Sequence, residues 1–222
     1  GDFEPQATEF SFEQELNLPD TKLGEVKIYG KIDRLDLYEK DGHTWVKVID
    51  YKTGSKKIAY DDIYYGLSLQ LLVYLDGAMT VIPAEDILPG GTFYFYVDDP
   101  MPRLDFGENV QAAINKSFKL NGLLLDDEMV IAAMDHEADA KTSDILPVYR
   151  SEFKLNQEEF ADIIDYVRKT VVRQIKNIYE GDIKIRPYKK GHDYACQYCD
   201  YKGICQFDDA ITRGGYEVLK AA

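Results

Sequence analysis

Two segments of the chain favour an extended conformation, and a turn signal separates them. Val26 to Tyr38 and Trp45 to Lys52 are rich in β-branched and aromatic residues, and Lys40-Asp41-Gly42-His43 lies between them. An Asp-Gly pair between two such runs is a strong short-range signal of a β-hairpin. We therefore expect a hairpin over residues 24 to 52, which restricts the fold to architectures built on a sheet.

The open end of this hairpin carries two acidic residues and a lysine. Asp33 lies in Gly30-Lys31-Ile32-Asp33-Arg34, and Asp50 and Lys52 lie in Ile49-Asp50-Tyr51-Lys52-Thr53-Gly54. Side chains two apart on a strand share a face, so Asp50 and Lys52 point the same way. If the strands pair Asp33 near Asp50, the two carboxylates repel unless a cation lies between them.

The residue types at this end of the hairpin suit one kind of chemistry. Hard carboxylate oxygens favour Mg²⁺ or Mn²⁺, and an adjacent lysine can hold or activate a water against a phosphodiester. The pattern predicts metal-dependent phosphodiester hydrolysis at Asp33, Asp50 and Lys52. The alternative is a surface hairpin in which Asp50 and Lys52 form an ordinary ion pair.

An apolar helix is expected over residues 62 to 79, after the hairpin. Gln70 and Tyr74 are four residues apart, so they lie on one helix face beside Leu67 and Leu71. Polar groups on an apolar helix are costly unless they bond to something. The pair therefore suggests a functional contact, although a core tyrosine beside a capped glutamine would give the same pattern.

Composition limits the class of protein. With 222 residues, of which 45% are hydrophobic, the chain can bury a substantial core as one domain. No stretch approaches ~18 uninterrupted apolar residues, so no membrane span is expected. The chain begins Gly1-Asp2-Phe3 without a signal peptide, from which we expect a cytoplasmic fragment of a longer protein. A net charge of −14 argues against a free-standing non-specific DNA binder.

The rest of the chain reads as further strands and helices. We expect a first strand over residues 7 to 18 and an aromatic strand over Thr92 to Val97, bounded by Pro89-Gly90-Gly91 and by residues 98 to 102. Residues 120 to 127 suggest a loop leading into a short helix, and residues 136 to 144 suggest an exposed segment. Asn156-Gln157-Glu158-Glu159 is close to a capping box and opens a helix to about Tyr179, with Gly181 as its stop. Its expected core face is Phe160, Ile163, Ile164, Val167, Val171, Ile175 and Ile178.

All three cysteines lie close together: Cys196, Cys199 and Cys205. An odd number packed this tightly is a poor disulfide framework and instead indicates a metal or cluster site. With His192 as a fourth ligand, the residues could hold tetrahedral zinc. Alternatively they could supply three of the four ligands of a [4Fe–4S] cluster, and the spacing leaves both open.

These motifs together resemble the PD-(D/E)xK nuclease fold of RecB type. The shared features are Gly30 to Arg34, Asp50 to Gly54 and the helix with Gln70 and Tyr74. The resemblance implies an α/β fold with a mixed central β-sheet flanked by helices. It implies a metal site at Asp33, Asp50 and the carbonyl of Tyr51, with Lys52 assisting the attacking water. Glu9 is the best match to the family's additional acidic ligand and Glu13 is the alternative, while Gln70 and Tyr74 match its Gln-x-x-x-Tyr positions.

The cysteines extend the resemblance to the nuclease domain of AddB, found in AddAB-type ATP-dependent helicase–nucleases. In that family a distant upstream cysteine joins three C-terminal ones around a [4Fe–4S] cluster, so the fourth ligand is expected upstream of Gly1. The resemblance implies a Mg²⁺-dependent exonuclease of single-stranded DNA or duplex ends that works with a helicase partner in break repair. It implies one nuclease domain, with a catalytic core over 1–105, a helical part over 106–190 and an iron–sulfur segment over 191–210. A Cas4-like exonuclease and a catalytically idle DNA-holding scaffold are the alternatives.

Overall fold

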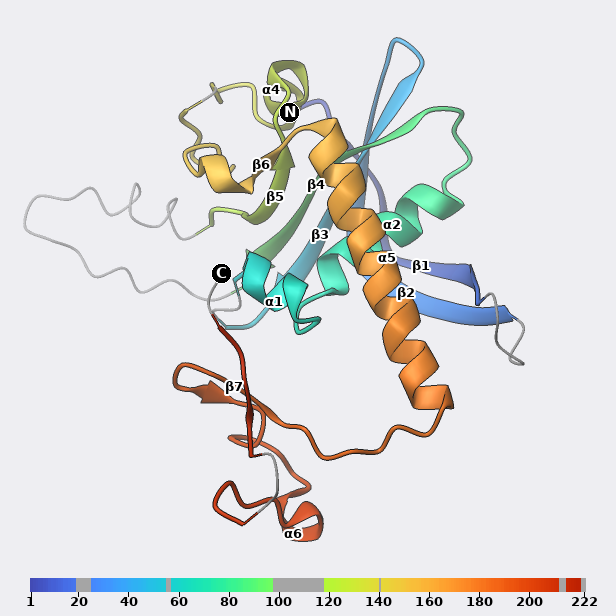
Figure 1. The fold of residues 1–222 in the computed structure, drawn as a ribbon. Coiled ribbons are helices and arrows are strands. Elements are labelled where there is room, and N and C mark those ends of the chain that lie inside the picture. The colour runs from blue at the N-terminus through green and yellow to red at the C-terminus, as the bar shows by residue number, and fades with distance from the viewer. Residues whose placement is uncertain (19–24, 55–56, 98–117, 140, 212–214, 221–222) are drawn as a thin grey trace, which may run out of the picture.

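The computed structural model describes residues 1–18, 25–54, 57–97, 118–139, 141–211 and 215–220. Its centre is a mixed sheet of six strands in the order β1-β2-β3-β4-β5-β6. The strands are β1 Glu4–Asn17, β2 Glu25–Lys40, β3 His43–Lys52, β4 Ile87–Tyr96, β5 Asn121–Leu125 and β6 Lys154–Leu155. The expected mixed α/β architecture is therefore confirmed (Figure 1).

The β2–β3 hairpin forms as the sequence predicts. The two strands are antiparallel, and Lys40 pairs with His43 next to the turn. Asp41 and Gly42, the two turn residues, have φ values of 51° and 83°. Two positive φ angles characterise the tight turn that matches the twist of paired strands. The turn fixes the register along the whole hairpin, including Arg34 opposite Ile49 next to the site.

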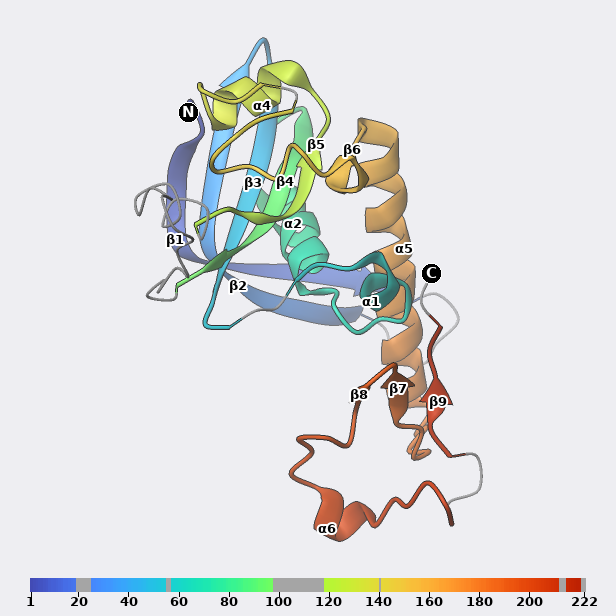
Figure 2. The ribbon, with the colours of Figure 1, turned by 90° about the vertical axis from the view of Figure 1, so that its left-hand side faces the viewer.

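Two long helices cover one face of the sheet. Helix α2 (Gln70–Val81) packs against strands β1 to β4, and α5 (Gln157–Tyr179) packs against α2 and against strands β4 and β6. Figure 2 shows α2 between the sheet and α5. The shorter helices are α1 (Tyr60–Tyr64), α4 (Glu128–Met134), η1 (Ser151–Phe153) and α6 (Lys202–Cys205). The core is continuous from the sheet through α2 to α5, with Leu75, Phe93 and Phe160 fully buried.

The single helix expected over residues 62 to 79 is instead two helices joined by a turn. Helix α1 ends at Tyr64, and Gly66 follows with a φ of 77°. The amide of Gly66 donates to the carbonyl of Ile63, and that of Leu67 donates to the carbonyl of Asp62. This pair of bonds around a left-handed glycine is the Schellman motif, which ends a helix. Gln70 is consequently the first residue of a new helix.

The expected loop over residues 120 to 127 is wrong, because residues 121 to 125 form β5. Leu123 and Leu124, neighbours on this strand, are both fully buried, so both of its faces are covered. A strand buried on both faces lacks the alternation that identifies a strand in sequence. The short helix expected next is confirmed as α4, with the side chain of Asp127 accepting hydrogen bonds at its start.

Pro89, Gly90 and Gly91 lie inside β4, where a strand boundary was expected. The ladder between β3 and β4 shifts register here, between the pairs Val46–Pro89 and Lys47–Gly91. A bulge tolerates proline and glycine in a strand because one residue leaves the ladder. The expected boundary at residues 98 to 102 lies outside the described residues. The first expected strand is confirmed as β1.

The long helix α5 begins and ends close to the expected residues. Asn156 accepts a hydrogen bond from the amide of Glu159, and the Glu159 side chain accepts one from the amide of Asn156. This confirms the capping box. Phe160, Ile164 and Val167 are buried as expected, but Ile178 is 74% exposed. The last turns of α5 extend past the sheet, so the apolar face has nothing to cover there (Figure 1).

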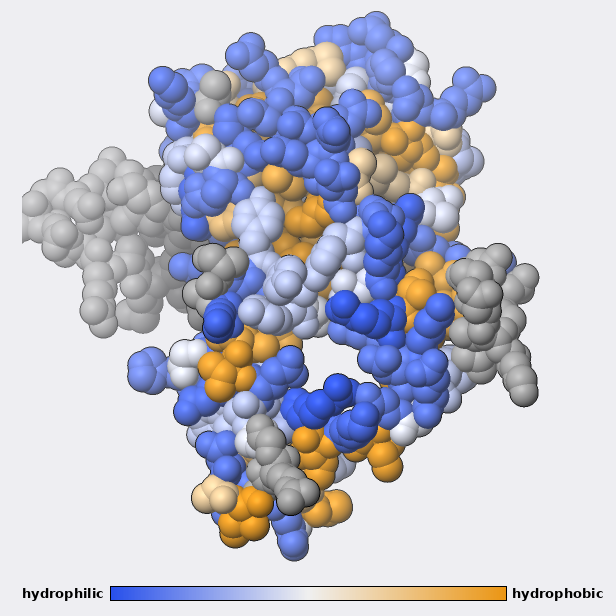
Figure 3. All heavy atoms as spheres, in the orientation of Figure 1, coloured by the Kyte–Doolittle hydropathy of each residue, from blue (hydrophilic) through white to orange (hydrophobic). Residues whose placement is uncertain are grey.

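Residues after 187 form a separate small lobe. It contains a three-stranded sheet in the order β8-β7-β9, from Tyr188–Lys190 (β7), Asp193–Tyr194 (β8) and Glu217–Val218 (β9). Figure 3 shows the lobe below the main body, with an opening between the two on this side. Among the described residues, no helix is long and apolar enough to cross a membrane.

Candidate active site

Strand β3 and helix α2 bring four of the expected site residues together. Asp50 is 2% exposed, and its carboxylate lies 2.5 Å from the ammonium of Lys52. Gln70 accepts a hydrogen bond from Lys52 Nζ (3.1 Å) through Oε1 and donates from Nε2 to Asp50 Oδ1 (3.4 Å). Nε2 of Gln70 also lies 3.0 Å from the hydroxyl of Tyr74. The four side chains form one polar network in which each orients the next.

Asp33 joins the edge of this network from β2. Its Oδ2 accepts a hydrogen bond of 2.7 Å from the backbone amide of Tyr51, between Asp50 and Lys52 in the chain. The register pairs Arg34 with Ile49, so Asp33 and Asp50 are the next residues along the two strands. Its charge also acts on Lys52. Asp33, Asp50 and Lys52 thus lie at the open end of the hairpin, and their role as a metal-binding and catalytic site stays a prediction.

Lys52 is held in its charged form. Burial lowers the pKa of Lys52 and is the largest influence, but the hydrogen bond and charge of Asp50, with smaller effects of Tyr94 and Asp33, raise it above its ordinary value overall. A charged ammonium cannot accept a proton from water. Lys52 therefore suits the role of a fixed cation and hydrogen-bond donor, which can orient a nucleophile or stabilise developing negative charge.

Glu9 and Glu13 make other contacts. Glu9 has a 73% exposed side chain, 3.0 Å from the ammonium of Lys31, and a φ of 58°. Glu13 is exposed and pairs with Lys27. Within the described residues, no three side chains among histidine, cysteine, aspartate and glutamate are close enough to hold a metal. The assignment of Glu9 as an acidic ligand stays a prediction.

The remaining donors still fit a hard cation. Asp33 and Asp50 offer carboxylate oxygens, and the carbonyl of Tyr51 lies in the chain between Asp50 and Lys52. Oxygen donors of this kind suit Mg²⁺ or Mn²⁺ and not a soft metal.

The cysteines lie far along the chain, on the small lobe. Cys196, Cys199 and Cys205 are free thiols and partly exposed. Within the described part of the chain, these three cysteines are not close enough together to hold a metal ion, with or without His192. The hydroxyl of Tyr216 bonds to Cys196, and burial together with that bond raises the pKa of Tyr216 to about 12.

A second polar cluster behind the site was missed from the sequence. Asp36 is fully buried, and its carboxylate is 2.7 Å from Arg34 Nε and 2.9 Å from Lys47 Nζ. Arg34 also hydrogen-bonds the side chain of Tyr51. Strands β2 and β3 pair Asp36 directly with Lys47, and the turn already fixes that register. The hairpin register was therefore the signal that could have revealed this cluster.

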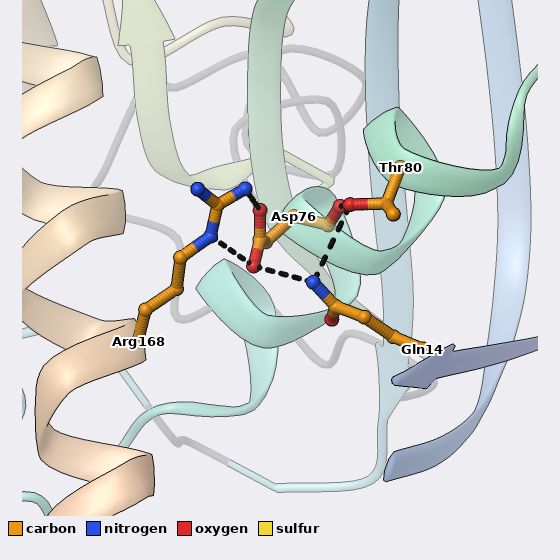
Figure 4. Close-up of polar contacts among 4 residues, drawn as sticks. All are labelled: Gln14, Asp76, Thr80 and Arg168. Atoms are coloured by element: carbon orange, nitrogen blue, oxygen red, sulfur yellow. Dashed lines mark hydrogen bonds and ion pairs between the residues drawn. The ribbon is translucent and has the colours of Figure 1, made fainter. Parts of the chain in front are cut away.

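A third cluster, also missed, fixes helix α2 from its other side. Asp76 of α2 lies between Arg168 of α5 and Gln14 of β1 (Figure 4). Arg168 donates to both carboxylate oxygens of Asp76, with 2.8 Å from Nε to Oδ2. Gln14 Nε2 donates to Oδ2 at 3.1 Å and to the hydroxyl of Thr80 at 3.3 Å. The cluster links three elements around the helix that carries Gln70 and Tyr74.

The sequence matches known proteins over nearly its whole length. Residues 1–206 match the model of the PD-(D/E)XK nuclease superfamily. The chain is 37% identical over 237 residues to the B subunit of the ATP-dependent helicase/deoxyribonuclease of Clostridium acetobutylicum. It is 39% identical over 241 residues to the protein of that name from Alkaliphilus metalliredigens. Both alignments cover 99% of this chain but 21% of the relative, so the chain spans about a fifth of their length.

Proposed function

The chain belongs to the PD-(D/E)XK nuclease superfamily, and on that premise we propose that it hydrolyses phosphodiester bonds in DNA with the help of a divalent metal. The observation that carries the proposal is the network of Asp50, Lys52 and Gln70, with Asp33 at its edge. Asp33, Asp50 and the Tyr51 carbonyl would hold Mg²⁺ or Mn²⁺. When bound, such an ion lowers the pKa of water and polarises the phosphate.

The protein's own residues have separable roles in this reaction. Lys52, charged and fixed by Asp50 and Gln70, would orient the attacking water and balance negative charge in the transition state. Gln70 would hold the ammonium in place through Oε1, and the bond between Gln70 and Tyr74 would fix the amide orientation. Asp50 is buried, so its charge acts strongly on its neighbours. An idle scaffold would have no need to keep this network.

We infer further that the chain is the nuclease part of a helicase–nuclease that processes double-strand breaks for recombinational repair. The names of its relatives, each the B subunit of an ATP-dependent helicase/deoxyribonuclease, support a partner protein and a DNA substrate. The acidic charge of −14 supports the same view, because such a chain attracts DNA poorly by itself. A [4Fe–4S] cluster at Cys196, Cys199 and Cys205 remains part of the proposal. Within the described residues, these three thiols are not close enough together to hold a metal, so no step of the proposed hydrolysis depends on the cluster.

The test compares digestion of labelled single-stranded DNA in Mg²⁺ by the intact protein and two lysine variants. Lys52→Ala should lower the rate by about 100-fold or more, because the fixed cation is lost from the transition state. Lys40→Ala is the matched control, since this exposed lysine ends the neighbouring strand β2 at the hairpin turn, far from the candidate site. Lys40→Ala should melt like the wild type, whereas Lys52→Ala should melt at a lower temperature because it removes the ammonium paired with the buried Asp50. The rates are therefore compared at a temperature at which all three proteins are folded. A Lys52→Ala protein that cuts at the wild-type rate would contradict the proposed catalytic role.

A further inference from the structure

A groove of about 420 Å³ separates the main body from the small lobe, and its lining includes Ser68, two residues before Gln70. The turn between α1 and α2 forms one wall, with Leu67 and Ser68. Tyrosines of the small lobe line the other wall: Tyr188, Tyr194 and Tyr198. The volume lies within the ~300–1,000 Å³ typical of small-ligand sites.

Direct contacts between the two parts hold the walls of the groove in place. Lys190 of β7 lies 2.6 Å from a carboxylate oxygen of Asp62 and 3.5 Å from one of Asp61, both on α1. The amide of Lys220 also donates to the hydroxyl of Tyr65, at 3.2 Å. Direct contacts between the small lobe and the segment that precedes α2 therefore hold the two walls of the groove together.

The tyrosines of the lobe wall offer aromatic faces to a ligand. Tyr198 is 87% exposed, so core packing does not explain its ring. Its hydroxyl is 3.1 Å from Nε2 of the neighbouring Gln197, which also lines the groove. Tyr194 is 37% exposed and packs edge-on against Tyr216, with 5.8 Å between ring centroids. The ring of Tyr194 is thus supported by Tyr216, and the ring of Tyr198 is accessible to a ligand.

The opposite wall carries a polar group that lacks a partner. Ser68 is 7% exposed, and its Oγ has no hydrogen-bond partner within the described part of the chain. A buried hydroxyl without a partner is costly. This oxygen is itself buried, so what the groove offers a ligand is chiefly the aromatic faces of the tyrosines on the lobe wall.

The groove is also adjacent in sequence to the reactive network. Ser68 lies two residues before Gln70, whose Oε1 holds the ammonium of Lys52. The groove itself is not strongly basic, because Asp62 and Asp193 accompany Lys190 in its lining. In a chain with a charge of −14, affinity for DNA must come largely from something other than phosphate attraction. Stacking of bases on aromatic side chains is such a source, and it tolerates any base sequence.

We propose that this groove binds a nucleobase of single-stranded DNA, stacked on Tyr194 and Tyr198, next to the phosphate to be cut. The inference rests on the proposed nuclease function and adds a base-binding subsite to it. Because the subsite acts by stacking, its contribution to DNA affinity should depend only weakly on salt.

Photocrosslinking tests the subsite directly. The intact protein is mixed with single-stranded oligonucleotides that carry 5-iodouracil, in EDTA so that no strand is cut. Irradiation of the wild type followed by peptide mass spectrometry should place a crosslink within residues 188–198. Absence of that crosslink in the wild type would overturn the proposal. If the crosslink is present but Mg²⁺ supports no cutting, the proposed function fails and the subsite stands.

Three tyrosine variants make the test specific. Tyr198→Ala should lower the crosslink yield about tenfold, which is within the roughly 5- to 140-fold effect of losing one stacked aromatic residue. Tyr198→Phe should keep it, because the ring remains. Tyr201→Ala is the matched control, since Tyr201 is 70% exposed on the same lobe and does not line the groove. Equal yields in Tyr198→Ala and wild type, or an equal loss in Tyr201→Ala, would show that the groove is not the base site.

Discussion

At the scale of single residues, the two buried carboxylates of the hairpin have different surroundings. Asp50 faces Lys52 and Gln70 on the α2 side and belongs to the candidate site. Asp36 faces Arg34 and Lys47 and has no exposed surface. Burial lowers the pKa of Lys47 despite the nearby Asp36, whereas the pKa of Lys52 is raised. The pKa values of two lysines on strand β3 are thus shifted in opposite directions.

The raised pKa of Lys52 gives a prediction about pH. A lysine whose pKa rises on folding adds stability that is complete below its ordinary value of 10.5 and is lost as the pH rises through the folded value. Lys52 should therefore stay charged at neutral and mildly alkaline pH. Hydrolysis of a small phosphodiester should show no loss assignable to Lys52 until the pH exceeds 10.5. A loss near neutral pH that disappears in Lys52→Arg would contradict this.

Asp36 should be essential to stability and not to chemistry. Asp36→Asn leaves Lys47 buried without its counter-charge, which costs about 3 kcal/mol in comparable buried pairs. Urea unfolding of the variant measures this difference in the free energy of unfolding. Asp41→Asn is the control, since Asp41 is exposed in the turn and asparagine tolerates its φ of 51°. Equal losses in both variants would refute the assigned role of Asp36.

Metal affinity provides a separate test at the site. Calorimetric titration with Mn²⁺ should show binding in the wild type that weakens at least tenfold in Asp50→Ala, because one of two carboxylate ligands is removed. Asp86→Ala serves as the control, because Asp86 is exposed and pairs with His43 at the opposite end of β3. Equal Mn²⁺ affinity of the wild type and Asp50→Ala would show that Asp50 is not a metal ligand.

At the scale of elements, the sequence predicts those features that depend on local chemistry. The Asp-Gly turn, the capping box at Asn156 and the four-residue spacing of Gln70 and Tyr74 all specify their structures over a few residues. The break at Gly66 and strand β5 were missed for different reasons. A glycine inside an apolar run signals a helix end weakly, and a strand buried on both faces has no period-two pattern. The Asp76–Arg168 pair joins residues far apart in the chain, so no local pattern could reveal it.

That pair gives the prediction at this scale. Arg168→Ala should destabilise the protein by about 2–3 kcal/mol, because Asp76 is buried and loses its main counter-charge. Lys169→Ala should cost under about 1 kcal/mol, since the adjacent lysine makes an exposed ion pair with Asp165. Thermal unfolding of the two variants makes the comparison. Equal melting temperatures of the two variants would show that the Asp76–Arg168 ion pair in Figure 4 stabilises the protein no more than an exposed ion pair does.

At the scale of the whole molecule, the three cysteines set a limit on what this chain holds by itself. A cubane cluster needs four thiolate ligands, and the sequence contains three cysteines. The purified 222-residue chain should therefore be colourless, without the broad visible absorption of iron–thiolate centres. Metal analysis completes the measurement. A brown protein would contradict the prediction, and one equivalent of zinc would favour His192 as the fourth ligand.

The break at Gly66 has an electrostatic consequence for the whole molecule. A continuous helix would have placed Gln70 in mid-helix, where backbone amides are all engaged. Instead Gln70 is the first residue of α2, and no side chain caps that end of the helix. The start of a helix carries roughly half a positive elementary charge on its free amides. In a strongly acidic protein, the break therefore puts the positive end of α2 at Gln70, whose side chain contacts Asp50 and Lys52 of the candidate site.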